Sequence, residues 1–179
     1  MRIISGIYKS RRFPIPANFR ARPTTDFARE NIFNVIHNLM DLQGTTALDL
    51  FSGTGSIGFE LISRGCNQVV CVEKDAYHIA FIRKVKDELQ ADGLVIIKGD
   101  AWGYIKTCNL TFDFIFADPP YTMKELGNVP QFILSHNLLK PGGIFVMEHP
   151  TAYDFSAIKG FNQRRIYGAV NFSLFNHTL

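Results

Sequence analysis

Short apolar runs alternate with amphipathic segments from residue 47 onward, and this alternation is the strongest pattern in the chain. The apolar runs cover residues 47–51, 69–72, 94–97, 112–117 and 143–147. Helical spacing predicts helices over residues 58–64 and 76–89, and a further helix that ends at residues 140–143. Near-continuous apolar strands separated by helices are typical of a parallel sheet covered on both faces. The pattern therefore predicts an α/β fold.

The first 44 residues follow a different pattern and form a unit of their own. Residues 2–4 and 11–16 predict a short β-hairpin, whose second strand Pro14 and Pro16 confine to a sheet edge. A helix then opens near Asp26 with Thr24 or Thr25 as its N-cap. Its apolar positions repeat at helical spacing and predict one buried face through about residue 40: Ile32, Val35, Ile36 and Leu39.

The last residues predict an antiparallel hairpin on the edge of the sheet. Residues 162–167 and 170–175 predict its two strands, and Gly168 supplies the turn between them. We therefore divide the chain into an N-terminal appendage, residues 1–44, and a main domain, residues 45–179.

The net charge of +3 hides an uneven distribution of charge. Residues 1–30 hold seven basic side chains against two acidic ones, whereas the other residues hold 12 basic and 14 acidic. A basic segment on a near-neutral domain indicates a polyanionic partner. The basic residues are Arg2, Lys9, Arg11, Arg12, Arg20, Arg22 and Arg29.

Several classes of protein are disfavoured by the composition. Three cysteines without a C-x-x-C pair, and no secretory leader, indicate a cytoplasmic chain with reduced thiols. The five histidines are scattered, so no metal site is expected. No apolar run is long enough to span a membrane.

A glycine-rich turn follows the first apolar run of the main domain. The stretch from Asp49 through Phe51, Gly53 and Gly55 to Gly58 contains a G-x-G-x-x-G pattern, which also occurs in dinucleotide-binding folds. A carboxylate directly before the turn would repel a pyrophosphate but suits a ligand that carries an ammonium and a sulfonium. This turn therefore favours S-adenosylmethionine over a nicotinamide dinucleotide, and a nicotinamide oxidoreductase stays an alternative.

Acidic residues also follow the second and third apolar runs. Glu73 comes directly after residues 69–72, where it can accept both ribose hydroxyl hydrogens of either cofactor. Asp100, followed by Ala101, comes after residues 94–97, where it can accept a hydrogen bond from an adenine amino group.

The most informative motif is Asp118-Pro119-Pro120-Tyr121, which follows the fourth apolar run. Two consecutive prolines fix a rigid backbone, which would aim the Asp118 carboxylate and the Pro119 carbonyl at one point. Two such acceptors grip the N–H groups of an exocyclic amine, and Tyr121 can stack on the base that carries it. This arrangement predicts methyl transfer to a base amine, in which positioning supplies most of the rate.

Taken together, these motifs resemble the class I S-adenosylmethionine-dependent amino-methyltransferases. Further segments resemble one bacterial family in particular, the 16S ribosomal RNA guanine-N2 methyltransferases. These segments are residues 1–6, 22–26, 29–34, 63–65 and 165–168. Ser10 stands where that family leads us to expect glycine. The resemblance implies a Rossmann-like sheet of seven strands, mostly parallel, with the last strand antiparallel.

The resemblance also implies roles for individual residues and a partner. Asp49, Phe51, Gly53 and Gly55 would line the methionine end of the cofactor, Glu73 would hold the ribose, and Asp100 with Ala101 the adenine. Asp118, Pro119, Pro120 and Tyr121 would hold the guanine, and the seven basic residues would contact RNA phosphates. The implied partner is 16S ribosomal RNA in the small ribosomal subunit, bound by a monomer.

Three further interpretations stay open. A DNA adenine-N6 methyltransferase also uses an Asp-Pro-Pro-Tyr motif, although such enzymes usually carry a further target-recognition domain. A protein glutamine-N5 methyltransferase generally has asparagine where this chain has Asp118. A catalytically silent RNA-binding or assembly protein would keep the fold without needing the Asp118 motif.

Overall fold

The computed structural model describes residues 1–17, 19 and 25–177, and seven strands form one continuous sheet in it. The strands are β1 (Thr46–Leu50), β2 (Gln68–Glu73), β3 (Leu94–Lys98), β4 (Phe112–Ala117), β5 (Leu139–His149), β6 (Phe161–Tyr167) and β7 (Val170–Asn176). Their order is β3-β2-β1-β4-β5-β7-β6, and β7 pairs antiparallel with both β5 and β6. The predicted Rossmann-like class I methyltransferase fold is confirmed, including the hairpin near the C-terminus.

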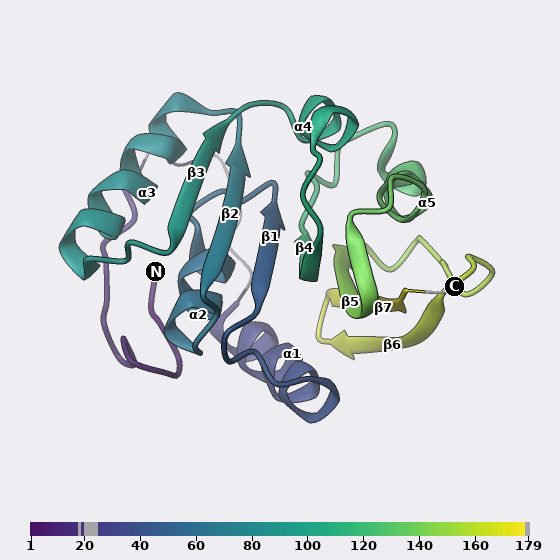
Figure 1. Ribbon diagram of the computed structural model, residues 1–179, viewed down its shortest axis with the longest axis horizontal. Helices are drawn as coiled ribbons and strands as arrows, with labels where there is room; N and C mark the ends of the chain where they lie inside the picture. The colour runs from purple at the N-terminus through teal and green to yellow at the C-terminus, as the bar shows by residue number, and fades with distance from the viewer. Residues whose placement is uncertain (18, 20–24, 178–179) are drawn as a thin grey trace.

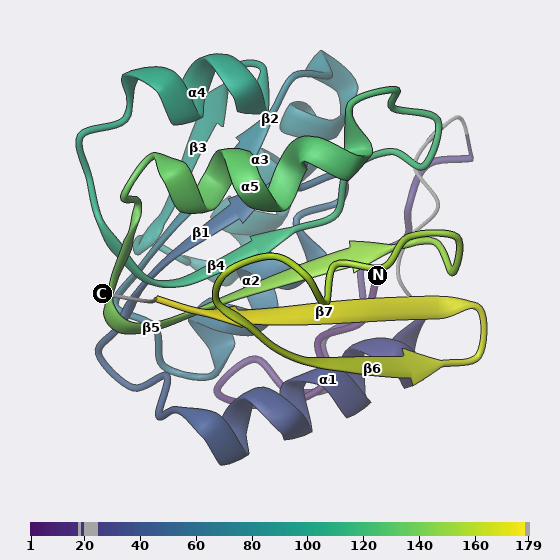
Figure 2. The same cartoon turned by 90° about the vertical axis from the view of Figure 1, so that its right-hand side faces the viewer.

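Helices cover both faces of this sheet. They are α1 (Asp26–Leu39), α2 (Ser56–Ser63), α3 (Ala76–Leu89), α4 (Ala101–Thr107) and α5 (Val129–Ser135), with a 3₁₀ turn η1 (Leu126–Asn128). Apolar side chains of α1, α2 and α3 pack in one cluster, and those of α4 and α5 pack in a second cluster. Figure 1 shows the strands side by side, and Figure 2 shows α4 and α5 on one side of the sheet with α1 on the other.

The basic N-terminal segment, residues 1–30, contributes to the first of these clusters. Ile3 and Phe13 are buried in it together with α1 and α2. Main-chain N–H groups of Ile4 and Ser5 donate to the buried Glu60 carboxylate on α2 over 2.8 and 3.0 Å. The predicted boundary at residue 44 therefore divides parts that are joined by a common core, and it stays a prediction.

Most predicted elements agree with the structure to within a few residues, and α3 agrees in full. Thr25 is the N-cap of α1, because its side chain accepts a hydrogen bond from the N–H of Ala28 at 3.2 Å. Ile32 and Ile36 are buried as predicted, but Leu39 is 43% exposed because α1 ends there, beyond the edge of the core.

The predicted N-terminal hairpin is confirmed in a short form: Arg2 and Arg12 form an antiparallel bridge, and main-chain hydrogen bonds join Ile3 to Arg11 and Met1 to Phe13. One predicted element is wrong, and one helix was missed. The helix before β5 ends at Ser135, and Lys140-Pro141-Gly142-Gly143 lies inside β5. The pairing of β4 with β5 shifts at this point, so these four residues form a bulge, where proline and glycine are tolerated. Helix α4, of seven residues, was not predicted.

No helix among the described residues is long and apolar enough to cross a membrane.

Candidate functional site

A cavity of about 580 Å³ opens where the carboxyl ends of the parallel strands meet the helices that follow them. This volume lies in the range of small-molecule sites, and the carboxyl ends of parallel strands are where α/β sheets bind ligands. The predicted residues that line it are Asp49, Phe51, Gly53, Glu73, Asp100, Ala101, Asp118, Pro119, Pro120 and Tyr121. The fold therefore gathers the three sequence motifs around one space.

Gly55 is the predicted cofactor residue that is not among those lining the cavity. It is the N-cap of α2, with a left-handed φ of 73°. A Cβ atom there would meet Ile82 and Phe59 at 3.1 Å. Gly55 thus allows the tight turn into α2 and its packing against α3, and its expected ligand contact stays a prediction.

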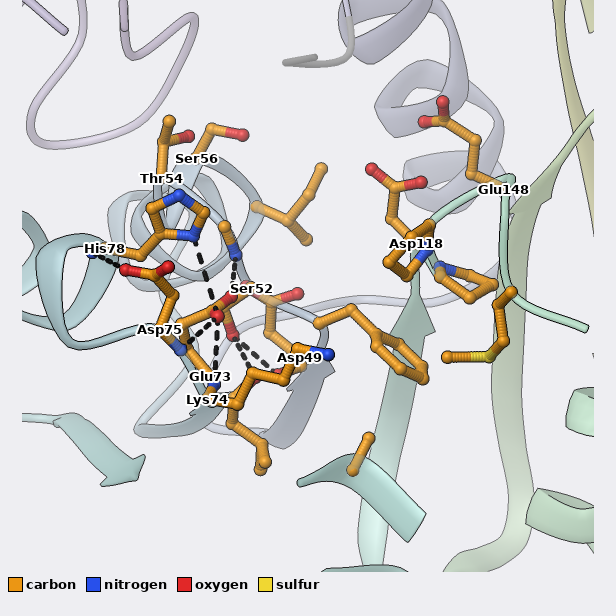
Figure 3. A pocket seen from close by; sticks show the side chains of 18 of the residues that line it. Asp49, Ser52, Thr54, Ser56, Glu73, Lys74, Asp75, His78, Asp118 and Glu148 are labelled. Carbon is orange, nitrogen blue, oxygen red and sulfur yellow. Dashed lines mark hydrogen bonds and ion pairs between the residues drawn. The ribbon is translucent and has the colours of Figure 1, made fainter. Parts of the chain in front are cut away.

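Figure 3 shows the polar side chains at two separate ends of the cavity. We call them the Glu73 end, with Glu73, Asp75 and His78, and the Asp118 end, with Asp118 and Glu148. Asp49, on β1, stands between the strands that carry the two ends, because β1 pairs with β2 on one side and with β4 on the other.

At the Glu73 end, main-chain N–H groups hold the Glu73 carboxylate in place. Its Oε1 accepts hydrogen bonds from the N–H groups of Lys74 and Asp75 at 2.9 and 2.8 Å. Its Oε2 accepts one from the N–H of Gly53 at 2.8 Å. The His78 ring lies 3.6 Å from Oε1 and stacks on Phe19, with centroids 4.1 Å apart. Glu73 thus ties the glycine-rich turn to the end of β2.

Asp49 is a buried acid beneath the same turn. Its Oδ2 accepts a hydrogen bond from the N–H of Gly58 at 3.1 Å and lies 3.8 Å from the Cys71 thiol. Burial raises the pKa of Asp49 to about 7, and the bond from Gly58 only partly offsets this effect. A buried acid such as Asp49 suits a cationic ligand. Phe51, two residues later, has a left-handed φ of 61°, which is rare for a bulky residue.

Asp100 has a structural role besides the predicted contact with the cofactor. Its Oδ2 accepts a hydrogen bond from the N–H of Gly103 at 3.1 Å, so Asp100 is the N-cap of α4. The residue also lines the cavity, beside Ala101 and Gly99. One carboxylate oxygen caps the helix, and the predicted contact between Asp100 and adenine stays a prediction.

At the Asp118 end, a second acid stands beside the predicted one. Glu148 lies near the end of β5, is only 5% exposed, and accepts a hydrogen bond from the Tyr121 hydroxyl at 3.1 Å. Burial, followed by the nearby Glu148 and Asp49 charges, raises the pKa of Asp118 well above its usual range. The acid Glu148 directly follows the apolar residues 143–147, as Glu73 follows 69–72, so sequence analysis could have found it.

Other residues that line the cavity carry no sequence signal. Thr25, His78 and Val170 reach it from the start of α1, from α3 and from β7. Thr25, Thr54 and Ser56 also border a second cavity of about 670 Å³, which lies against the N-terminal segment and includes Arg2 and Arg12 in its wall. The first cavity therefore adjoins a basic surface.

The basic residues of the N-terminal segment differ in what they contact. Lys9, Arg11 and Arg12 are exposed. Arg2 is partly exposed, and its Nε lies 3.1 Å from the Asp26 carboxylate. Arg20 and Arg22 lie outside the described residues.

Arg29 is not available for the predicted contact with RNA. It is 2% exposed, and its guanidinium donates to the Asp26 carboxylate and to the Arg2 carbonyl. The prediction is wrong because the helical spacing of α1 turns Arg29 inward, toward the core, where it stabilises the start of the helix.

Among the described residues no three His, Cys, Asp or Glu side chains are grouped so that they could hold a metal ion.

Comparisons with known proteins agree with this geometry. The chain is 33% identical, over 83% of its length and 75% of the relative, to ribosomal RNA small subunit methyltransferase D of Buchnera aphidicola. It is 28% identical to the protein of the same name from Haemophilus influenzae, over 83% of this chain and 78% of the relative. A solved structure of a hypothetical protein from a Thermus species shares the fold, with a TM-score of 0.86, 24% identity and coverage of 98% and 99%. The family model described as conserved hypothetical protein 95 matches residues 1–176, so the chain belongs to that family, and the resemblance indicated by its motifs is confirmed.

Proposed function

We propose that this protein transfers a methyl group from S-adenosylmethionine to the exocyclic N2 amine of a guanine in the 16S RNA of the small ribosomal subunit. One observation carries the proposal: Asp118, Pro119 and Tyr121 line the same cavity as Asp49 and Glu73. An acceptor site for an amine and an acidic site for a cationic cofactor therefore share one space. The names of the relatives, ribosomal RNA small subunit methyltransferases, support RNA as the substrate.

The residues at the Glu73 end fit S-adenosylmethionine. Asp49 offers a buried carboxyl to the positive charges of the methionine portion, and the cavity wall around it includes apolar residues such as Val72 and Ile57. Glu73 offers a carboxylate held by three N–H groups for the ribose hydroxyls. When bound, the cofactor supplies an electrophilic methyl group on a sulfonium.

The residues at the Asp118 end would orient the amine. The Asp118 carboxyl and the Pro119 carbonyl accept its two N–H groups, which turns the nitrogen lone pair toward the methyl group. That lone pair forms the new N–C bond, while the electrons of the broken S–C bond stay on sulfur. The proton that the amine then loses can pass to Asp118, since burial favours its protonated form. Alignment of this kind can supply roughly 7–11 kcal/mol of the barrier.

The exposed basic residues Lys9, Arg11 and Arg12 would bind RNA phosphates beside the cavity. They are needed because the acids in the cavity repel a polyanion. Arg2, partly paired with Asp26, would add to this surface, and we keep Arg20 and Arg22 as proposed phosphate contacts. The target guanine must be unpaired or flipped out of a helix before its amine can enter the cavity.

The proposal can be tested with isotope-labelled S-adenosylmethionine. Small ribosomal subunits from cells that lack the protein are incubated with the purified protein and the labelled cofactor. Duplex DNA is treated in the same way in a separate reaction. Nucleoside mass spectrometry then identifies the methylated nucleosides. We expect N2-methylguanine in the RNA and no label in the DNA. Label found only as N6-methyladenine in DNA would establish the DNA methyltransferase alternative, and no transfer at all would favour a silent RNA-binding protein.

A further inference from the structure

The acid beside Asp118 has no part in holding the amine in the function proposed above. Glu148 is 5% exposed and lines the cavity from β5. Strands β4 and β5 are parallel, and Ala117 stands opposite Met147. Asp118 directly follows the end of β4 and Glu148 is the next residue of β5, so the two lie near each other. Figure 3 shows the two side chains together at one end of the cavity, pointing the same way.

A hydrogen bond orients the Glu148 carboxyl. The Tyr121 hydroxyl donates to its Oε1 at 3.1 Å, so the ring expected to stack on the base and the acid in the wall are held together. The three other acids that line the cavity on its strand ends have contacts elsewhere: Asp49 accepts from Gly58, Glu73 accepts from Gly53, Lys74 and Asp75, and Asp100 caps α4. Glu148 shares with Asp118 the end of the cavity where the amine would lie.

The chemistry of the base gives such an acid a task. Asp118 and Pro119 can accept the N–H groups of any base amine, so they do not separate guanine N2 from adenine N6. The neighbouring ring atom does separate them: N1 of guanine carries a hydrogen, whereas N1 of adenine is an acceptor. A carboxylate can only accept hydrogen bonds. Beside the amine it therefore favours guanine and repels the lone pair on N1 of adenine.

We propose that Glu148 accepts the N1–H of the target guanine and thereby selects guanine over adenine. This inference rests on the proposed function, because it assumes that a base amine is bound at Asp118. It assigns Tyr121 a second task, which is to fix the orientation of the selecting carboxylate. Sites built to bond a polar group of the substrate can reject an analogue without that group by factors of about 10⁴, because the buried partner is then left unsatisfied.

The test pairs a change in the protein with a change in the base. RNA is assembled with guanine or with 2-aminopurine at the target position, which mass spectrometry of RNA fragments locates. 2-Aminopurine keeps the amine, lacks O6 and has an acceptor at N1. We expect the wild-type protein to prefer guanine by about 100-fold or more. In Glu148→Gln the side-chain amide can donate to N1, so this preference should fall to about tenfold or less. Tyr121→Phe, which keeps the ring, should reduce the preference by a smaller factor of about three.

A binding measurement without turnover completes the test. Inosine carries N1–H but no amine, so RNA with inosine at the target should bind the wild-type protein more tightly than RNA with adenine there. Glu148→Gln should bind the two RNAs equally, while its calorimetric affinity for S-adenosylmethionine stays within about twofold of the wild-type value. An unchanged guanine preference in Glu148→Gln, or equal wild-type binding of inosine and adenine RNA, would overturn the inference. Failure of the wild-type protein to methylate any guanine would instead overturn the proposed function.

Discussion

The two ends of the cavity use their carboxyl groups in different ways. At the Glu73 end, the Glu73 carboxylate accepts hydrogen bonds from three main-chain N–H groups. At the Asp118 end the donor to Glu148 is a side-chain hydroxyl, and burial dominates the pKa of Asp118. A carboxylate that satisfies the backbone belongs to the fold as well as to the ligand site. Substitutions at the Glu73 end should therefore change stability and cofactor affinity together, and substitutions at the Asp118 end should change base recognition and transfer but not cofactor affinity.

The largest effect is expected from Asp118→Ala. It removes an acceptor for the amine, and loss of one preorganised group in an active site costs about 10²–10³-fold in rate. We expect methyl transfer to fall by about 10³-fold, measured with labelled cofactor on undermethylated small subunits. Cofactor affinity by calorimetry should stay within about twofold, as should RNA affinity. Transfer near the wild-type rate would show that Asp118 does not hold the amine.

A smaller, combined effect is expected from Glu73→Gln. The glutamine amide turns an NH₂ group toward a main-chain N–H group that Glu73 now satisfies, and a buried unsatisfied donor costs about 1–3 kcal/mol. We expect the free energy of unfolding to fall by about that amount and the dissociation constant of S-adenosylmethionine to rise about 10–100-fold. Chemical denaturation and calorimetry measure the two.

Glu88→Gln is the matched control for that change, since Glu88 is exposed on α3 and pairs with Lys84 at 3.9 Å. Its unfolding free energy should stay within about 0.5 kcal/mol of the wild-type value. If Glu73→Gln weakened cofactor binding without loss of stability, the difference between the two ends of the cavity would disappear.

The dependence on pH should distinguish Asp49 from the other acids. Its pKa of about 7 lies above that of an unfolded aspartate, so the folded state holds the proton more tightly. The contribution of Asp49 to the stability of the free protein should therefore fall as the pH rises from about 4 to about 7, and then level off. A cationic ligand binds the ionised form, so cofactor affinity should rise about tenfold between pH 6 and pH 8.

Two controls isolate this titration. Asp49→Asn should bind S-adenosylmethionine weakly and with little change between pH 6 and pH 8. Methylthioadenosine, which lacks the amino-acid portion, should bind the wild-type protein with nearly constant affinity over the same range. A tenfold rise that persists in Asp49→Asn would assign the titration to the ligand or to another residue.

The sequence predicted the parts of this site that depend on one strand and the turn after it. Glu73 and Asp118 follow apolar runs directly, and both line the cavity as expected. What it did not predict depends on contacts between elements. Arg29 counts as a basic residue in sequence, but the core side of α1 buries it against Asp26. Residues 140–143 look like a helix end, yet pairing with β4 incorporates them into β5 as a bulge.

The basic residues of the N-terminal segment also differ, because some are exposed to solvent and one forms hydrogen bonds inside the fold. Substitutions of the exposed ones give the smallest predicted effect. Arg11 and Arg12 are exposed, whereas Arg29 is used inside the fold. Each exposed arginine that neutralises a phosphate adds about one unit to the slope of log affinity against log salt. Replacing both by glutamine should flatten that slope by up to about two units and weaken RNA binding less than about tenfold at physiological salt. Cofactor affinity should not change.

The control for that pair removes the same charge elsewhere on the surface. Lys106 and Lys159 are exposed on α4 and in the loop before β6, outside the N-terminal segment. Their joint replacement by glutamine should leave the salt slope within about half a unit of the wild-type value, because neither belongs to the proposed phosphate-binding surface. Equal slopes for the two double variants would mean that RNA senses only the net charge of the protein. A flatter salt slope only in the variant with Arg11→Gln and Arg12→Gln would place the phosphates next to the second cavity. The wall of that cavity includes Arg12 and shares Thr25 with the first cavity.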